Sequence, residues 1–273
     1  MEYFSEKHFR LRQKKLMFSI MLIIFCLLVI CSCAGTRSEK KESWFPDKNQ
    51  WSKALVNAAG HRATWMPLVG AVVIASGGWD KNISNWAVKT KPVYGSYENA
   101  ENASDILVAS SHIGMVLSSF AIPAKYESWL LSTVEQNLWE HAGVFMATSL
   151  TDPIKRWTDR DRPNGAKRSF PSWHATRAAA YSGMGYRNIE LAEFNHAIHY
   201  SSQALFASLA AGTAWARIEA GQHYPTDVLF GAALGNFVAI FVHDVFLSNS
   251  ENKYISLQTF GNSGIILFVE LVF

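Results

Sequence analysis

Six apolar segments separated by polar breaks run through the middle of this chain, and they constrain its fold more than any other feature. They span residues 65–75, 106–122, 138–150, 174–186, 192–216 and 228–246. Runs of this length, with apolar residues at helical rather than alternating spacing, favour α-helices over β-strands. The sequence therefore predicts an all-α fold, with the helices packed around a shared core.

Two of the apolar segments, 106–122 and 228–246, approach the length of a membrane span. Each carries a polar residue, His112 in the first and Asn236 in the second. Small residues within 231–235 give the second segment a face suited to close helix packing, which occurs in soluble cores and in membranes alike. We expect these segments to form the core of the domain, and entry into the membrane is the alternative.

The first 33 residues have the order of a secretory signal. A basic stretch (7–15) precedes an apolar run (16–30), and small residues follow. The end of the run resembles a bacterial lipoprotein box, which makes Cys33 the candidate for lipidation. An uncleaved signal anchor and plain secretion are the alternatives. The segment predicts a location in the bacterial cell envelope, on the periplasmic or outer-membrane face, with the N-terminal lipid or signal anchor contacting the membrane.

Composition divides the remainder of the chain. Residues 34–50 read as a polar tether, 51–248 as one helical domain, and 249–273 as an extension with a small β-hairpin around a glycine-flanked turn.

All three cysteines precede residue 34, so the exported body has no thiol for an internal disulfide. Without residues 1–33 the chain holds 20 basic and 20 acidic residues, a balance that argues against nucleic acid as a partner.

The chemistry is concentrated in three short strings of the second half. The first holds Lys155 and Arg162, seven residues apart, a spacing that puts both cations on one face of a helix. Pro163 then stops the helix near Arg162. Taken alone, such a charged run would be a solvated, salt-bridged surface.

The second string is Ser172-Trp173-His174, which precedes an alanine-rich run. Ser172 is a good N-cap, and the free amides of the first helical turn would bind a phosphate with help from the helix dipole. His174, in that first turn, would reach the same ligand. A simple serine cap beside an exposed histidine is the alternative.

The third string is Arg217 followed by His223 and Asp227. Pro225 suits the first position of a helix, so His223 lies just before the helix and Asp227 lies in its first turn. The carboxylate would accept a hydrogen bond from one ring nitrogen of His223 and leave the other free as a nucleophile.

The order Lys-x6-Arg-Pro, Pro-Ser-x-His, Arg-x5-His-x3-Asp resembles the type 2 phosphatidic acid phosphatase superfamily, which includes bacterial acid phosphatases and vanadium haloperoxidases. The resemblance implies the helical bundle of that superfamily and a phosphohistidine on His223, oriented by Asp227, with His174 as general acid. It also implies a set of phosphate-binding groups, and no metal or cofactor. Those groups are Lys155, Arg162, Ser172, Arg217 and the amide of Trp173.

By this resemblance the chain is an exported phosphatase acting on phosphate monoesters or diphosphates, either a phosphorylated lipid or a small soluble ester. Two positions depart from the family pattern: Trp173 replaces a glycine, and Ala216 replaces a serine. The large indole beside the phosphate site keeps a catalytically silent phosphate-binding lipoprotein open as an alternative. A vanadate-dependent haloperoxidase is the other.

Overall fold

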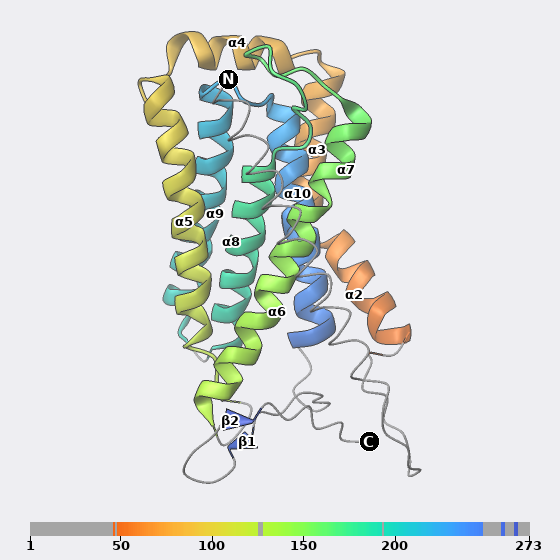
Figure 1. Ribbon diagram of the computed structural model, residues 1–273, viewed down its shortest axis with the longest axis vertical. Helices are drawn as coiled ribbons and strands as arrows, with labels where there is room; N and C mark the ends of the chain where they lie inside the picture. Colours follow the sequence, from red (N-terminus) through yellow and green to blue (C-terminus); the bar gives the residue numbers. More distant parts are fainter. Residues whose placement is uncertain are drawn as a thin grey trace, which may run out of the picture. The chain divides into compact units, whose positions relative to one another are not determined.

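The computed structural model describes residues 46, 48–124, 128–192, 194–247, 258–259 and 265–266. Its helices are α2 (Lys48–Gly60), α3 (Arg62–Ser76), α4 (Asp80–Thr90), α5 (Tyr97–Ser119), α6 (Trp129–Ser149), α7 (Thr151–Thr158), α8 (Trp173–Leu191), α9 (His196–Glu219) and α10 (Pro225–Val242), which a π-turn, His243–Leu247, extends. Figure 1 shows them as a helical bundle. The expected all-α class is confirmed, and each of the six apolar segments coincides with much of one helix.

Helix α8 is the centre of the bundle. It packs against α5, α6, α9 and α10, and in Figure 1 it lies between α5 and α6. Its alanines are almost fully buried because small side chains let four neighbours approach one helix closely. The main hydrophobic core forms where α8 meets α5, α6 and α10, from Val108, Met115, Val144, Ala147, Ala178, Ala180, Tyr181, Met184, Val238, Ala239 and Val242.

A close approach between α8 and α10 brings two of the three strings together. At Gly231 an added Cβ would lie 2.7 Å from the carbonyl oxygen of Ser172, so only glycine fits. The amide of Ser172 donates a hydrogen bond to the carbonyl of Asp227 at 3.0 Å. The start of α8 is thereby fixed against the start of α10.

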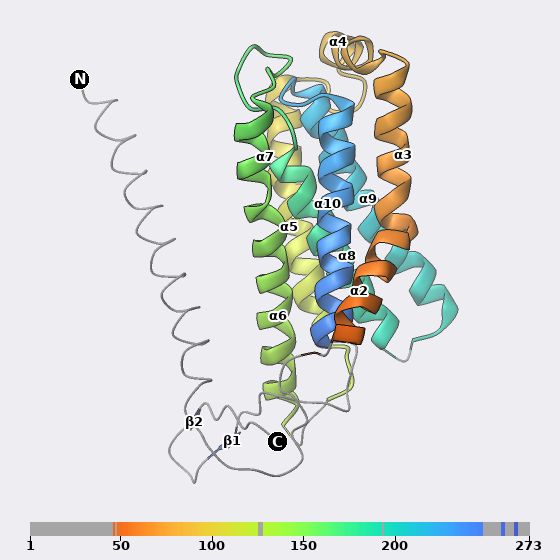
Figure 2. The ribbon, with the colours of Figure 1, turned by 90° about the vertical axis from the view of Figure 1, so that its right-hand side faces the viewer.

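Helix α10 with its π-turn is, in the described part of the chain, the one helix long and apolar enough to cross a membrane. More than half of its most apolar window is buried inside the bundle. It packs against α8 and α3, as Figure 2 also shows, and Asn236 donates to the carbonyl of Ala63 at 2.8 Å. These contacts are those of a core helix, in line with the expectation for 228–246.

Two local features differ from what the sequence suggested. With its asparagines, Pro92 and Gly95, the stretch 79–102 suggests a long loop or a short subdomain, and the structure places α4 and the start of α5 there. Asp80 in the first turn of α4 favours that helix through the dipole, and the break that follows holds Pro92 and Gly95.

The second difference concerns the two cations of the first string. Helix α7 ends at Thr158, where Asp159 adopts a left-handed conformation, φ 38°, so Arg162 lies beyond the helix. The expectation that Lys155 and Arg162 share one helical face is therefore wrong. The two cations are still near enough for the charge of Arg162 to lower the pKa of Lys155.

The ends of the chain are described only in part. Gln258–Thr259 (β1) pairs antiparallel with Ile265–Ile266 (β2), which agrees with the expected C-terminal hairpin. The signal segment, Cys33 and nearly all of the tether lie outside the described residues. The domain limits at 33, 50 and 248 stay predictions, and α2 starts at Lys48, slightly before the expected start of the body.

Candidate functional site

The three strings converge at one end of the bundle. From the end of α7, Lys155 donates through Nζ to the carbonyl of Arg168 at 2.9 Å, in the loop that leads to α8. Arg162 donates to Oε1 of Gln222 at 2.5 Å, beside His223. These contacts and the link between Ser172 and Asp227 tie the first string to the second and third.

Two of the three cations are nearly excluded from solvent, and Arg162 is partly buried. Lys155 is 9% exposed and Arg217 is 5% exposed. Burial and the charge of Arg162 lower the pKa of Lys155 to about 8. Burial and the charge of Arg217 likewise lower the pKa of Arg162. Lys155 and Arg162 are disfavoured as cations by burial and by a neighbouring positive charge, so a bound anion would stabilise their charged forms.

Arg217 is held in place by α5. Its Nη1 donates to Oε2 of Glu101 at 3.0 Å and to Oγ of Ser104 at 3.1 Å. Glu101 was not predicted from the sequence, because it lies 116 residues before Arg217 and belongs to none of the three strings. No local signal marked it.

The start of α8 adds neutral donors to this cluster of cations. Ser172 is the N-cap, fully buried, and its Oγ accepts a hydrogen bond from the amide of Ala175 at 3.4 Å. The amides of Trp173 and His174 precede the first intrahelical bond and so have no partner within the helix. The predicted N-cap is confirmed, and its geometry suits an anion at the positive end of the helix.

His223 and Asp227 are buried side by side, at 2% and 0% exposure. Nδ1 of His223 lies 3.8 Å from Oδ2 of Asp227, close enough for electrostatic orientation but too far for a hydrogen bond. Oδ2 instead accepts from the amide of Tyr224 at 2.7 Å and from the Ser169 hydroxyl. Burial above all lowers the pKa of His223 to about 4, so its ring is neutral near pH 7.

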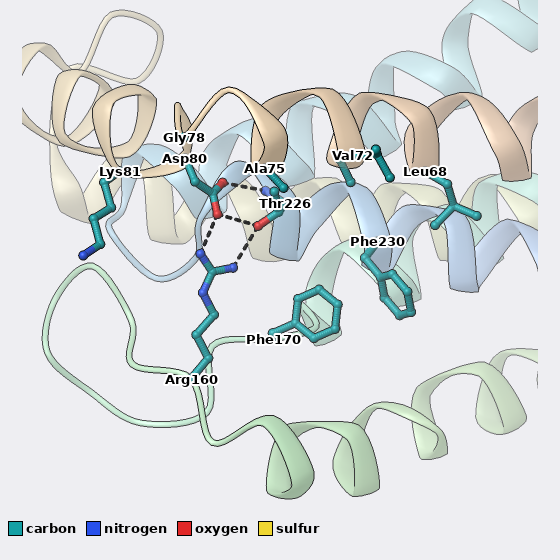
Figure 3. A pocket seen from close by; sticks show the side chains of 11 residues that line it. Leu68, Val72, Ala75, Gly78, Asp80, Lys81, Arg160, Phe170, Thr226 and Phe230 are labelled. Carbon is teal, nitrogen blue, oxygen red and sulfur yellow. Dashed lines mark hydrogen bonds and ion pairs between the residues drawn. The ribbon is translucent and has the colours of Figure 1, made fainter.

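Arg160 is the main functional residue that the sequence analysis missed. Its Nη1 donates to Oδ1 of Asp227 at 2.7 Å. As Figure 3 shows, Nη1 also donates to Thr226 Oγ1 at 2.8 Å, and Nη2 donates to Oδ2 of Asp80 at 2.5 Å. Burial raises the pKa of Asp227, but hydrogen bonding and the charge of Arg160 outweigh burial and lower it. Arg160 is one of several groups, with Ser169 among them, that keep this carboxylate ionised.

The pocket in Figure 3 borders this ion-pair network, with Asp80, Arg160 and Thr226 in its lining. It is open, with a volume of about 680 Å³, a polar end at Asp80 and Arg160, and apolar walls that include Leu68, Phe170 and Phe230. None of the site residues predicted from the sequence lines it. It is therefore not the place where those residues would hold a phosphate.

His174 faces an acidic residue that the sequence analysis also missed. Its Nε2 lies 3.1 Å from Oδ1 of Asp105, on α5. Burial and the charge of Arg217 lower the pKa of His174, and Asp105 partly offsets them.

Trp173 does not project freely from the start of α8. The guanidinium carbon of Arg177 lies 4.9 Å from the centroid of the indole, and the His174 ring stands edge-on at 5.2 Å. The indole that replaces the family glycine therefore contacts Arg177, in the next turn of its own helix.

Comparisons with known proteins identify the family of this chain. The family model described as the PAP2 superfamily matches residues 144–251, which include all three strings. Decaprenylphosphoryl-5-phosphoribose phosphatase from two strains of Mycobacterium tuberculosis, CDC 1551/Oshkosh and ATCC 25618/H37Rv, is 31% identical over 140 residues, covering 48% of this chain and 68% of the relative. The chain belongs to the PAP2 superfamily. A crystal structure of a transmembrane PAP2-type phosphatidylglycerolphosphate phosphatase from Bacillus subtilis matches with a TM-score of 0.48 at 20% identity, over 68% of this chain and 94% of that one.

Membership in the PAP2 superfamily confirms the family and enzyme class expected from the motifs, a PAP2-type phosphatase acting on phosphate esters. The roles of the individual residues are a separate question. Those roles, including that of His223 as the residue that forms the phosphohistidine, stay predictions.

Proposed function

We propose that this PAP2 protein is exported and hydrolyses phosphate monoesters or diphosphates of lipids through a phosphohistidine on His223. The observation that carries the proposal is the convergence of Lys155, Arg162 and Arg217 around a neutral, buried His223. The mutual repulsion of these cations is relieved when a phosphate with two negative charges lies between them.

In the proposed mechanism Nδ1 of His223 faces Asp227, which leaves Nε2 to attack the phosphorus. The bond from phosphorus to the leaving oxygen breaks, and His174 gives that oxygen its proton. Water, deprotonated by His174, then hydrolyses the phosphohistidine and regenerates both histidines. Lys155, Arg162, Arg217 and the amides that begin α8 stabilise the phosphoryl charge, so the mechanism needs no metal.

Two observations support a lipid phosphate as the substrate. The Mycobacterium tuberculosis relatives are named for action on decaprenylphosphoryl-5-phosphoribose, a phosphorylated lipid. On this chain, α3 exposes Trp65, Met66, Val69, Val72 and Val73, each between 46% and 63%, at positions that share one helical face. An apolar stripe of this kind suits contact with a membrane, where an anchor at Cys33 would hold the enzyme.

The test uses the full-length chain in mild detergent with p-nitrophenyl phosphate and excess EDTA. We expect steady release of p-nitrophenol, and acid quenching during turnover of a radiolabelled substrate should leave label on a histidine. Turnover that requires an added divalent metal, or a purified chain that binds phosphate without any turnover, would overturn the proposal. Oxidation of halides in the presence of vanadate would replace it with haloperoxidase chemistry.

The pH profile of kcat/KM is expected to peak in the acid range because the two histidines set its limits. His223 attacks only when neutral, so the rate falls as pH drops below about 4. His174 must carry a proton, and its pKa lies below the ordinary value of 6.5, so the rate also falls as pH rises through that lower value. The measurement is initial rate against pH at substrate concentrations well below KM.

Asp105→Asn tests the assignment of the alkaline limb. The carboxylate of Asp105 raises the pKa of His174, so its removal should move the alkaline limb to lower pH and leave the acid limb in place. Asp152→Asn, which changes an exposed carboxylate on α7, is the matched control and should move neither limb. An alkaline limb that stays fixed in Asp105→Asn would contradict the role of His174.

A further inference from the structure

One face of α8 continues from the phosphate site into the bundle. Trp173, Arg177 and Tyr181 follow one another at intervals of four residues and therefore share that face. The guanidinium carbon of Arg177 lies 4.9 Å from the Trp173 ring centroid and 5.3 Å from that of Tyr181. Nε and Nη2 of Arg177 donate to the Tyr181 hydroxyl at 3.3 and 3.1 Å. The two rings and this hydroxyl fix the guanidinium in place.

Arg177 has no carboxylate in ion-pair contact within the described part of the chain. Arg160, Arg187 and Arg217 each form such a pair. Arg162, which we assign to the phosphate, also lacks a carboxylate partner within the same residues and bonds to the amide side chain of Gln222. A fixed, half-buried guanidinium that keeps Nη1 available is suited to an anion that arrives with a ligand.

The position of Arg177 specifies where on a substrate that anion would be. His174, the proposed donor to the leaving oxygen, comes three residues earlier, which on a helix is an axial distance of about 4.5 Å. The leaving group therefore begins beside His174, one turn from the guanidinium. Further along, His112 stacks on Tyr181 at 4.6 Å and contacts His141 at 2.8 Å between the Nε2 atoms, so α5 and α6 are bridged below Arg177.

We propose that Arg177 binds the second phosphate of a diphosphate substrate, the phosphate that departs with the leaving group. The inference rests on the proposed function and specifies the substrate class of the same site. His223 attacks the terminal phosphorus, the bond from it to the bridging oxygen breaks, and that oxygen leaves on the second phosphate with the proton of His174. Arg177 neutralises the charge that accumulates there. Trp173 then has a role that glycine cannot fill, because its ring supports the guanidinium.

The test compares farnesyl diphosphate with farnesyl monophosphate, which share one apolar chain, on the full-length protein in detergent. The wild type should have the higher kcat/KM on the diphosphate. Arg177→Gln should lower the diphosphate-to-monophosphate ratio of kcat/KM about 10-fold or more, since a charge-assisted hydrogen bond is lost. Arg177→Lys should restore part of the ratio. Arg156→Gln, which removes an exposed arginine from α7, should leave the ratio unchanged.

A binding measurement separates this proposal from the proposed function. Calorimetry with methylenediphosphonate, which cannot be hydrolysed at its bridge, should show about 10-fold weaker binding in Arg177→Gln than in the wild type, against a smaller change for inorganic phosphate. The subsite would be overturned if Arg177→Gln lost the same affinity for both ligands and the same kcat/KM on both substrates. An unchanged diphosphate-to-monophosphate ratio of kcat/KM would likewise overturn it. Diphosphonate binding that depends on Arg177 in a chain without turnover would keep the subsite and reject the hydrolytic function.

Discussion

Replacing His223 with alanine is expected to lower kcat on p-nitrophenyl phosphate about 10⁴-fold or more. Loss of a nucleophile removes the covalent route, and the remaining groups can only bind and polarise the ester. His223 is 2% exposed and its pKa is about 4, so no other protonation state of this ring takes part near neutral pH. The measurement is the rate of p-nitrophenol release at saturating substrate.

The control for His223→Ala is binding. Lys155, Arg162 and Arg217 remain, so inorganic phosphate should still bind, and circular dichroism should match the wild type. Acid quenching should leave no label on the variant protein. A variant that retains a tenth of the wild-type rate, or that still becomes labelled on histidine, would show that another residue is the nucleophile.

Arg160→Met is expected to lower the free energy of unfolding by about 2–3 kcal/mol, because it leaves the carboxylates of Asp80 and Asp227 without their shared cation. The Asp227 side chain is fully buried and that of Asp80 is 13% exposed. Water can therefore solvate the two carboxylates only weakly once the guanidinium of Arg160 is gone. Arg160 itself is 31% exposed, which places the expected effect below that of a fully buried pair. Urea denaturation followed by circular dichroism in detergent measures it.

Arg156→Met is the matched control on the same segment. The Arg156 side chain is 64% exposed and contacts Asp152 at 3.5 Å in an i,i+4 pair, so its loss should cost about 0.5 kcal/mol or less. Equal effects of the two substitutions would mean that the network around Asp227 adds nothing specific to stability. Activity offers a second measurement, since Arg160→Met should also lower kcat through the altered position and charge of Asp227.

Local spacing predicted the features that depend on neighbours in the chain. Ser172 caps α8, and Pro225 begins α10 just after His223, as the residue types require. The same reasoning failed for the pair Lys155 and Arg162. A seven-residue spacing puts two side chains on one helical face only if the helix continues, and here the left-handed Asp159 ends it first.

The sequence by itself determined the helical class, the superfamily and which residues of the three strings form the candidate site. It could do so because capping and motif spacing are set by covalent geometry over a few residues. Only the tertiary structure decided which partners hold those residues: Glu101 for Arg217, Asp105 for His174, and Arg160 between Asp80 and Asp227. These partners lie 67 to 116 residues away, and their ion pairs form because the starts of α4, α5, α8 and α10, the end of α9 and the segment after α7 come together.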